Sequence, residues 1–227
     1  MAKSAVKPKK IIGLRIEKKY SRAGFELAIG VDEAGRGPLA GPVFAAAAAI
    51  KNPFCRDVEW RYLLKSVNDS KKIGAKKREI VYQKIICHPN IVWASASAGN
   101  KTIDKINILQ ASKLAMERSV KKLKKRIGTQ IGDDKIICLI DGNFAIKITY
   151  EQKSIIGGDG KVFCIAAASI IAKVCRDRFM EKMDKLYSAY GFTRHKGYGT
   201  KQHLAAIKKH GACPIHRRTF APIARLA

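Results

Sequence analysis

Four acidic residues stand at the ends of apolar segments or beside glycines, and they are the side chains best placed to do chemistry. Asp32 and Glu33 follow an apolar run and lead into a Gly-Arg-Gly turn, Asp141 ends a second apolar run, and Asp159 lies in a glycine-rich loop. Carboxylates that converge without His or Cys favour hard cations such as Mg²⁺ or Mn²⁺. On a basic protein, a carboxylate site for two such ions is typical of phosphodiester hydrolysis.

Asp32 and Glu33 are neighbours, which restricts how they can share a site. Adjacent side chains of a strand point to opposite faces, so two acids in the middle of a strand would be separated. At a strand end, the glycines of the turn free the backbone from this alternation. The turn therefore predicts a shared metal site, and an ordinary polar turn after a strand is the alternative.

Asp177 competes with Asp159 as the acid that completes the site. It falls opposite the apolar stripe of a long predicted helix, between Arg176 and Arg178. A solvated ion pair on the helix explains such an acid. Asp159 is therefore the preferred candidate.

Two segments near the termini of predicted elements could contact the sugars or phosphates of a nucleic acid. Arg36, in the Gly-Arg-Gly turn of residues 35–37, places a cation beside the acids. Tyr198 lies between glycines and among cations, where an exposed ring can stack on a base or a sugar. The alternative for Tyr198 is a capping aromatic before the last helix.

A third candidate contact is the polar turn that contains Ser70, Lys71 and Lys72. Its hydroxyl and amines could bind a phosphate. A plain helix start explains the same residues equally well.

The charge balance indicates the kind of partner. The 227 residues include 45 Lys and Arg against 18 Asp and Glu, a formal net charge of +27 at pH 7. Such an excess favours a polyanion, and nucleic acid is the commonest one. An anionic membrane is the rival, but it is disfavoured because the chain has no long basic amphipathic helix with a large apolar face.

The apolar pattern predicts the elements that must position these side chains. Strands are predicted at 27–32, 43–50, 91–98, 136–141 and 147–156, and helices at 76–86, 103–125, 164–186 and 201–210. The alternation indicates a layered α/β domain. The first two strands are close enough to form a hairpin, so the sheet should be mixed.

The helix predicted from 103 to about 125 should pack against this sheet. Thr102 can cap its first turn, and Asp104 would stabilise its positive end. A single apolar stripe indicates core packing. The stripe consists of Ile106, Leu109, Met116, Val120 and Leu123.

Composition also divides the chain. Residues 1–26 are rich in lysine and predict a basic flexible arm, either solvated or ordered on nucleic acid. Residues 27–222 predict one domain that includes the C-terminal helices, and 223–227 form a tail. The sequence shows no signal peptide, and its longest apolar runs are too short to span a bilayer. We expect a cytoplasmic monomer without a membrane partner.

Several motifs resemble ribonuclease HII, the bacterial type 2 ribonuclease H family, and they follow one another in the family's order over residues 27–222. The motifs are Asp32-Glu33-Ala34-Gly35-Arg36-Gly37-Pro38, Asp69-Ser70-Lys71-Lys72, Asp141-Gly142-Asn143, Ala168-Ser169-Ile170-Ile171-Ala172, His195-Lys196-Gly197-Tyr198-Gly199-Thr200 and Cys213-Pro214-Ile215-His216-Arg217-Arg218.

The resemblance implies a ribonuclease H-like fold, in which helices flank a mixed five-stranded sheet and a helical extension follows at the C-terminus. It implies a hydrolase that cuts the RNA strand of RNA/DNA hybrids. It also implies incision on the 5′ side of single ribonucleotides embedded in duplex DNA, as in ribonucleotide excision repair, leaving 5′-phosphate and 3′-hydroxyl ends. The implied cofactor is a divalent metal, Mn²⁺ or Mg²⁺, with two ions in the active complex.

The resemblance also carries over to individual residues. The four metal-binding carboxylates of the family match Asp32, Glu33, Asp141 and Asp159. The loop that reads the ribose 2′-hydroxyl through its backbone matches Gly35, Arg36 and Gly37. The tyrosine that stacks on the deoxyribose just past the ribonucleotide matches Tyr198.

Two other functions compete with this interpretation. A non-catalytic nucleic-acid binder would explain the charge but not three acid-bearing segments. Ribonuclease HIII, the sister family, usually carries an additional N-terminal substrate-binding domain. The stretch before Asp32 is too short for such a domain.

Overall fold

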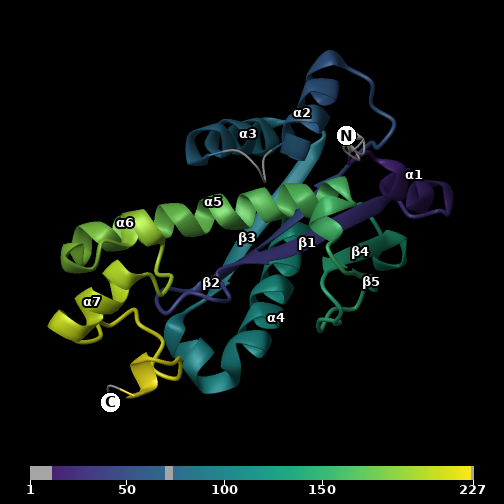
Figure 1. Ribbon diagram of the computed structural model, residues 1–227. Helices are drawn as coiled ribbons and strands as arrows, with labels where there is room; N and C mark the ends of the chain where they lie inside the picture. The colour runs from purple at the N-terminus through teal and green to yellow at the C-terminus, as the bar shows by residue number, and fades with distance from the viewer. Residues whose placement is uncertain (1–11, 70–73, 226–227) are drawn as a thin grey trace, which may run out of the picture.

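One mixed five-stranded sheet forms the centre of the molecule (Figure 1). The computed structural model describes residues 12–69 and 74–225. The strands are β1 (Leu27–Ala34), β2 (Val43–Ile50), β3 (Ile91–Ala98), β4 (Ile136–Asp141) and β5 (Glu151–Ile155). They lie in the order β3-β2-β1-β4-β5, with β2 antiparallel to β1 and β3, and β4 parallel to β1 and β5.

Helices cover both faces of the sheet and continue beyond it. The α-helices are α1 (Arg15–Arg22), α2 (Val58–Asp69), α3 (Ala75–Cys87), α4 (Asn100–Ile127), α5 (Phe163–Leu186), α6 (Phe192–His195) and α7 (Lys201–His210). Short 3-10 helices lie at Asp133–Lys135, Gly158–Gly160, Ser188–Tyr190 and Ile223–Arg225. This architecture confirms the predicted fold class.

The two faces of the sheet have separate cores. Ile29 and Val31 of β1 pack in the core on the α4 side, whereas Ala28 of the same strand packs in the core on the α5 side. This is the alternation expected of a strand that is buried on both faces. Figure 1 shows α5, α2 and α3 on one side of the sheet and α4 on the other. The alanine run of β2 leaves room for α4 and α5 to approach it from both sides.

A third core joins the C-terminal extension to the far end of α5. Its buried side chains include Met180 of α5, Phe192 of α6 and Ile207 of α7. The extension is also tied by backbone hydrogen bonds to the loop after β1, where Leu39 N–H donates to the Gly197 carbonyl. The segment between β1 and β2 is thereby held next to residues more than 150 positions away in the chain.

The apolar pattern predicted most elements to within a few residues, and the strands 43–50, 91–98 and 136–141 are confirmed residue by residue. Helix α2 was not predicted, although Trp60, Leu63 and Val67 form a buried stripe along it. Within the segment predicted to be a flexible arm, Arg15–Arg22 forms helix α1.

Helix α4 departs from its prediction in one further respect. Asn107 has φ 63° and ψ 167°, which breaks the helix into two segments. The break shifts the phase of the apolar stripe, so Leu109 is exposed, while Met116, Val120 and Leu123 are buried as predicted. Thr102 is not the cap, because the helix begins earlier, with Gly99 at the N-cap.

In the part of the chain that the structure describes, none of the helices has the length and apolar character needed to cross a membrane. The cytoplasmic location stays a prediction.

Candidate active site

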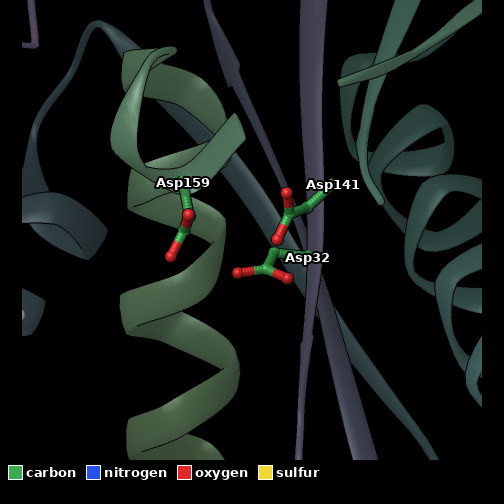
Figure 2. Close-up of side chains that lie close together, drawn as sticks. All are labelled: Asp32, Asp141 and Asp159. Carbon is green, nitrogen blue, oxygen red and sulfur yellow. The ribbon is translucent and has the colours of Figure 1, made fainter. Parts of the chain in front are cut away.

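Three carboxylates from distant parts of the chain converge where β1 and β4 meet the start of α5. The side chains are Asp32 on β1, Asp141 at the end of β4 and Asp159 in the 3-10 helix that precedes α5. Each contributes an oxygen, and these oxygens lie within 4.8 Å of one another. Figure 2 shows the three side chains gathered between the strands and the first turns of α5.

Close packing between β1 and α5 brings Asp159 to the sheet. A Cβ atom added to Gly30 would lie 2.2 Å from the backbone carbonyl carbon of Cys164 and from the amide nitrogen of Ile165. Only glycine fits at this position of β1, since the first turn of α5 rests directly on it. The loop before α5 is fixed to β4 as well, because Gly158 N–H donates to Asp141 Oδ1 at 2.7 Å.

Asp32 is the most buried member of the cluster. Burial raises the pKa of Asp32 well above its usual value, and the negative charges of Glu33 and Asp141 raise it further. The Ser169 hydroxyl on α5 and the Glu33 N–H, which donates to Asp32 Oδ1 at 2.7 Å, act in the opposite direction. A cation bound between the carboxylates would relieve this destabilisation of the charged form.

Glu33 lies outside the three-carboxylate cluster. We expected the strand to end before it, but β1 continues to Ala34, so Asp32 and Glu33 follow the ordinary alternation and point to opposite faces. Glu33 Oε1 pairs with Arg36 Nη1 at 3.3 Å. Burial raises the pKa of Glu33, Arg36 lowers it, and the charge of Asp141 raises it. Glu33 is thus within electrostatic reach of the cluster.

The donor set fits a hard divalent cation. Asp32, Asp141 and Asp159 offer only carboxylate oxygens, the ligands that Mg²⁺ and Mn²⁺ prefer over nitrogen or sulfur. Two of the three side chains are partly exposed, which leaves an approach for a substrate.

Two buried arginines hold the loop that follows Glu33. Arg217 is fully buried and donates through Nε to the carbonyl of Gly41 at 3.0 Å. Its terminal nitrogens donate to the carbonyls of Arg36, at 2.7 Å, and Gly35. Burial lowers the pKa of Arg217 to about 9. The guanidinium is therefore still charged at neutral pH.

Arg176, on α5, supports the same loop from the other side. Its Nη2 donates to the carbonyls of Ala40 at 3.2 Å and Lys196 at 2.9 Å, and its Nε donates to Pro42 at 3.3 Å. The guanidinium lies so close to Gly35 that a Cβ atom there would be 2.0 Å from Arg176 Nε. Gly35 also has φ +98°, a conformation that other residues rarely adopt.

Tyr198 lies beside this loop with its ring 46% exposed. A Cβ atom on Gly37 would be 3.6 Å from the Tyr198 ring, and the Arg176 guanidinium lies 6.0 Å from the ring centroid. The N-cap of α7 is Thr200, whose side chain accepts from His203 N–H. The capping role considered for Tyr198 therefore belongs to Thr200, and the tyrosine ring is available to a ligand.

The histidines near Tyr198 are structural. His195, His203 and His216 stack on one another, with ring centroids 4.4 and 5.2 Å apart. His216 and His203 are joined at 3.0 Å through their Nε2 atoms, and His203 Nδ1 lies 2.9 Å from the carbonyl of Tyr198. This chain of rings fixes the backbone that carries Tyr198.

Among the described residues, the rival acid Asp177 does not join the cluster. It is paired with Lys173 at 2.6 Å on α5, rather than with the adjacent arginines. Ser70, Lys71 and Lys72 lie outside the described residues, between the end of α2 at Asp69 and the start of α3 at Ala75.

Sequence reasoning gave no role in the site to Ser169, Arg176 and Arg217. One available signal was spacing, because Ser169 and Arg176 are seven residues apart and so share a face of α5. Arg217 carries no comparable signal. Its contacts with residues 35–41 arise only when the C-terminal extension folds back onto the loop after β1.

Comparison with known proteins identifies the family. The family model described as ribonuclease HII matches residues 29–223. Ribonuclease HII of Endomicrobium trichonymphae is 47% identical over 208 residues, which cover 91% of each chain. Ribonuclease HII of Coxiella burnetii (strain Dugway 5J108-111) is 48% identical over 200 residues, covering 88% of this chain and 91% of that one.

A solved structure agrees with the fold. The crystal structure of ribonuclease H2 from Pyrococcus horikoshii OT3 has a TM-score of 0.67 and 26% identity, and the match covers 88% of this chain and 96% of that one. Together with the match over residues 29–223, this likeness shows that the chain belongs to the ribonuclease HII family of hydrolases.

Proposed function

We propose that this ribonuclease H cleaves the RNA strand of RNA/DNA hybrids and cuts on the 5′ side of a single ribonucleotide in duplex DNA, leaving 5′-phosphate and 3′-hydroxyl ends. The observation that carries the proposal is the position of the carboxylate cluster next to the loop of residues 35–37 and the exposed ring of Tyr198. The proposal therefore sets a metal site beside a surface that reads the sugar.

We propose Asp32, Glu33, Asp141 and Asp159 as the catalytic residues that hold divalent Mg²⁺ or Mn²⁺, with Glu33 contributing from the edge of the three-carboxylate cluster. Two ions, when bound, would supply an activated water and stabilise the leaving 3′-oxygen. The proximity of Asp141 to both Asp32 and Glu33, which their raised pKa values reflect, supports this grouping.

The loop of residues 35–37 is the proposed reader of the ribose. A ribose 2′-hydroxyl donates and accepts hydrogen bonds and is what distinguishes RNA from DNA at one position. Backbone groups can read it only if their orientation is fixed, and Arg217 fixes the peptide groups of Gly35 and Arg36. The side chain of Arg36, 45% exposed, would contact a neighbouring phosphate.

Tyr198 is proposed to stack on the deoxyribose that follows the ribonucleotide. Its exposed ring lies over Gly37, so a nucleotide bound at the loop would meet it directly. Ser70, Lys71 and Lys72 remain proposed phosphate contacts. We propose that the enzyme acts as a monomer on these duplexes.

Cleavage mapping tests the proposal. A DNA duplex with one ribonucleotide, labelled at either end of the cut strand, is incubated with the enzyme and Mg²⁺ or Mn²⁺. We expect a single cut on the 5′ side of the ribonucleotide and no cut in the all-DNA duplex. Asp141→Asn should slow cleavage by roughly a thousandfold or more, equivalent to about 4 kcal/mol of barrier.

Asp177→Asn is the matched control, because it makes the same substitution in an acid that pairs with Lys173 outside the cluster. It should cut at the parent's rate. The proposal fails if the parent cuts both duplexes alike, or if Asp141→Asn retains the parent's rate.

A further inference from the structure

A basic groove lies between helix α1 and the segment that follows Asp159. The groove has a volume of about 670 Å³, and its walls come from two segments of the chain, residues 12–22 and 160–161. Gly160 and Lys161 directly follow Asp159 in the chain, so one wall of the groove is continuous with the segment that carries a carboxylate of the cluster. Among its described lining residues four are cationic and none is acidic: Arg15, Lys19, Arg22 and Lys161.

Helix α1 is fixed in place by a buried acid. Glu17 is 1% exposed, and its Oε1 accepts a hydrogen bond from Cys164 N–H at 2.9 Å. It therefore satisfies a free donor at the N-terminal end of α5 and interacts favourably with the positive end of that helix. Ile12 and Leu14 anchor the same segment in the core on the α5 side of the sheet.

This anchoring determines which face of α1 is presented outward. Arg15, Lys19 and Arg22 are spaced by four and three residues, so they lie along one face, and all three are exposed. At a rise of about 1.5 Å per residue, they span about 10 Å. That length corresponds to about three phosphates of one strand in a duplex.

We propose that α1 and Lys161 bind the sugar-phosphate backbone of the nucleic-acid duplex on one side of the cleavage position. This proposal rests on the proposed function, which puts the cleavage position at the carboxylate cluster. Residues 15–22 precede the segment 29–223 that matches the family model.

The chemistry of the groove favours phosphates over an apolar partner. Ile12 and Ile16 also line the groove, but both pack against the core, so the exposed side chains of its lining are the four cations. Such contacts release counterions and make binding salt-dependent, without distinguishing RNA from DNA.

The test compares two double variants that each remove two charges from one helix face. Arg15→Gln with Lys19→Gln alters the groove. The control is Lys121→Gln with Lys125→Gln, two exposed positions of α4 with the same spacing. Helix α4 covers the face of the sheet opposite to α5. Binding is measured by fluorescence anisotropy between 50 and 200 mM salt (roughly the range over which phosphate contacts show their effect), without divalent metal. The probes are an all-DNA duplex and the same duplex with one ribonucleotide.

We expect the α1 variant to bind both probes at least about tenfold more weakly at low salt. The negative slope of log K against log salt should become shallower by up to about 1.8, because two phosphate contacts are lost. The α4 variant should match the parent. Shortening the duplex from one end only should abolish the difference between the parent and the α1 variant, because the phosphates that contact α1 are then missing. Circular dichroism checks that both variants are folded.

Equal slopes for the α1 and α4 variants would overturn the proposal, as would a difference that persists when the duplex is shortened from either end. Failure of the proposed function is recognised separately. In that case the parent would not cut at the ribonucleotide, whereas the binding difference between the paired variants would be unaffected.

Discussion

Asp32 illustrates the conflict between stability and chemistry in a single side chain. It is 5% exposed and lies beside Asp141 and Glu33, and burial together with these charges raises its pKa well above the usual value. In the metal-free protein the ionised carboxylate therefore opposes folding. A neutral side chain of the same shape should relieve this cost.

We therefore predict that Asp32→Asn stabilises the metal-free protein by about 1–2 kcal/mol, which corresponds to roughly 2–8 °C in a chain of this size. Calorimetry in the presence of a chelator measures this change. Adding Mn²⁺ should raise the Tm of the parent, because the ion binds the folded state, and should raise that of the variant much less. An Asn variant that unfolds below the parent in chelator would contradict the prediction.

Arg217 donates to three backbone carbonyls of residues 35–41, the segment that includes the proposed ribose-reading loop, so we predict that it is a positioning residue. Arg217→Lys keeps the charge but cannot reproduce the planar fork that reaches all three. A loop displaced by about 1 Å can cost up to about a hundredfold in rate. We expect kcat to fall by at least about tenfold, with a smaller change in KM, when cleavage is assayed well below the Tm of the variant.

The comparison for this prediction is Arg218→Lys, at the exposed neighbouring position, which should leave kcat unchanged. If Arg217→Lys lowered only the thermal stability and left kcat at the parent's value, the positioning role would be excluded.

At the scale of elements, the break in α4 is the local feature whose contribution to the unfolding free energy is easiest to predict. Asn107 has a positive φ, and its side-chain oxygen accepts from Gln110 N–H at 3.1 Å, so it acts as the N-cap of the second helical segment. The break allows the two segments to present different faces to the sheet. Ile103 is buried before it and Ala111 after it.

Asn107→Ala removes the cap and leaves a residue with a Cβ atom in a conformation disfavoured for it, so the unfolding free energy should fall by about 1–3 kcal/mol. Asn107→Asp retains an acceptor and should stay within about 0.5 kcal/mol of the parent. Urea denaturation measures both changes. Equal stability of the Ala and Asp variants would show that the cap contributes nothing.

The elements that could be predicted from the sequence are those with a strong local pattern. The runs Val43–Ile50 and Ile136–Asp141 are buried on both faces, so their continuous apolar character is visible without knowledge of the fold. Helix α1 could not be predicted, because its position depends on a hydrogen bond that Glu17 accepts from the N–H of Cys164, far away in the chain. The break at Asn107 is likewise a single-residue conformation that no apolar periodicity reveals.

Some residues of the candidate site could likewise be predicted from the sequence, and others could not. Asp32 and Asp141 end apolar segments, and Asp159 lies among glycines, so each was visible as a candidate. The roles of Arg176 and Arg217 were not visible, because exposed and buried arginines look alike in a sequence. Burial is decided by the return of the C-terminal extension to the loop after β1.

At the scale of the whole molecule, the C-terminal extension has its own internal network of hydrogen bonds through two buried histidine rings. Cys213 N–H donates to His216 Nδ1, which leaves the proton on Nε2 to be donated to His203. His203 in turn donates through Nδ1 to the Tyr198 carbonyl. Protonation of either ring at its accepting nitrogen would break this sequence of bonds.

This arrangement predicts how stability depends on pH. Burial lowers the pKa of both His203 and His216 from 6.5 to about 4. The unfolded chain takes up protons near pH 6.5, whereas the folded protein does not until about pH 4. The contribution to stability is therefore complete above pH 6.5 and is lost progressively as the pH falls toward 4.

Thermal unfolding between pH 7.5 and 4.5 (about one unit beyond the ordinary histidine pKa on the upper side) should show this loss. NMR titration of the ring protons should place both transitions near pH 4. His210→Gln, at an exposed position of α7, should keep the parent's profile. Transitions of the two buried rings near 6.5 would contradict the prediction.

The contact at Gly30 has a consequence for how this enzyme could diversify. Asp32 and Asp141 are carried by hydrogen-bonded neighbouring strands, whereas Asp159 depends on how deeply α5 sits on the sheet. A single methyl group at Gly30 would lift that helix and widen the gap to the third carboxylate while leaving the other two together. A substitution at Gly30 would therefore change the spacing of the three carboxylates, and with it the preferred size of a bound ion, although Gly30 itself has no side chain to bind one.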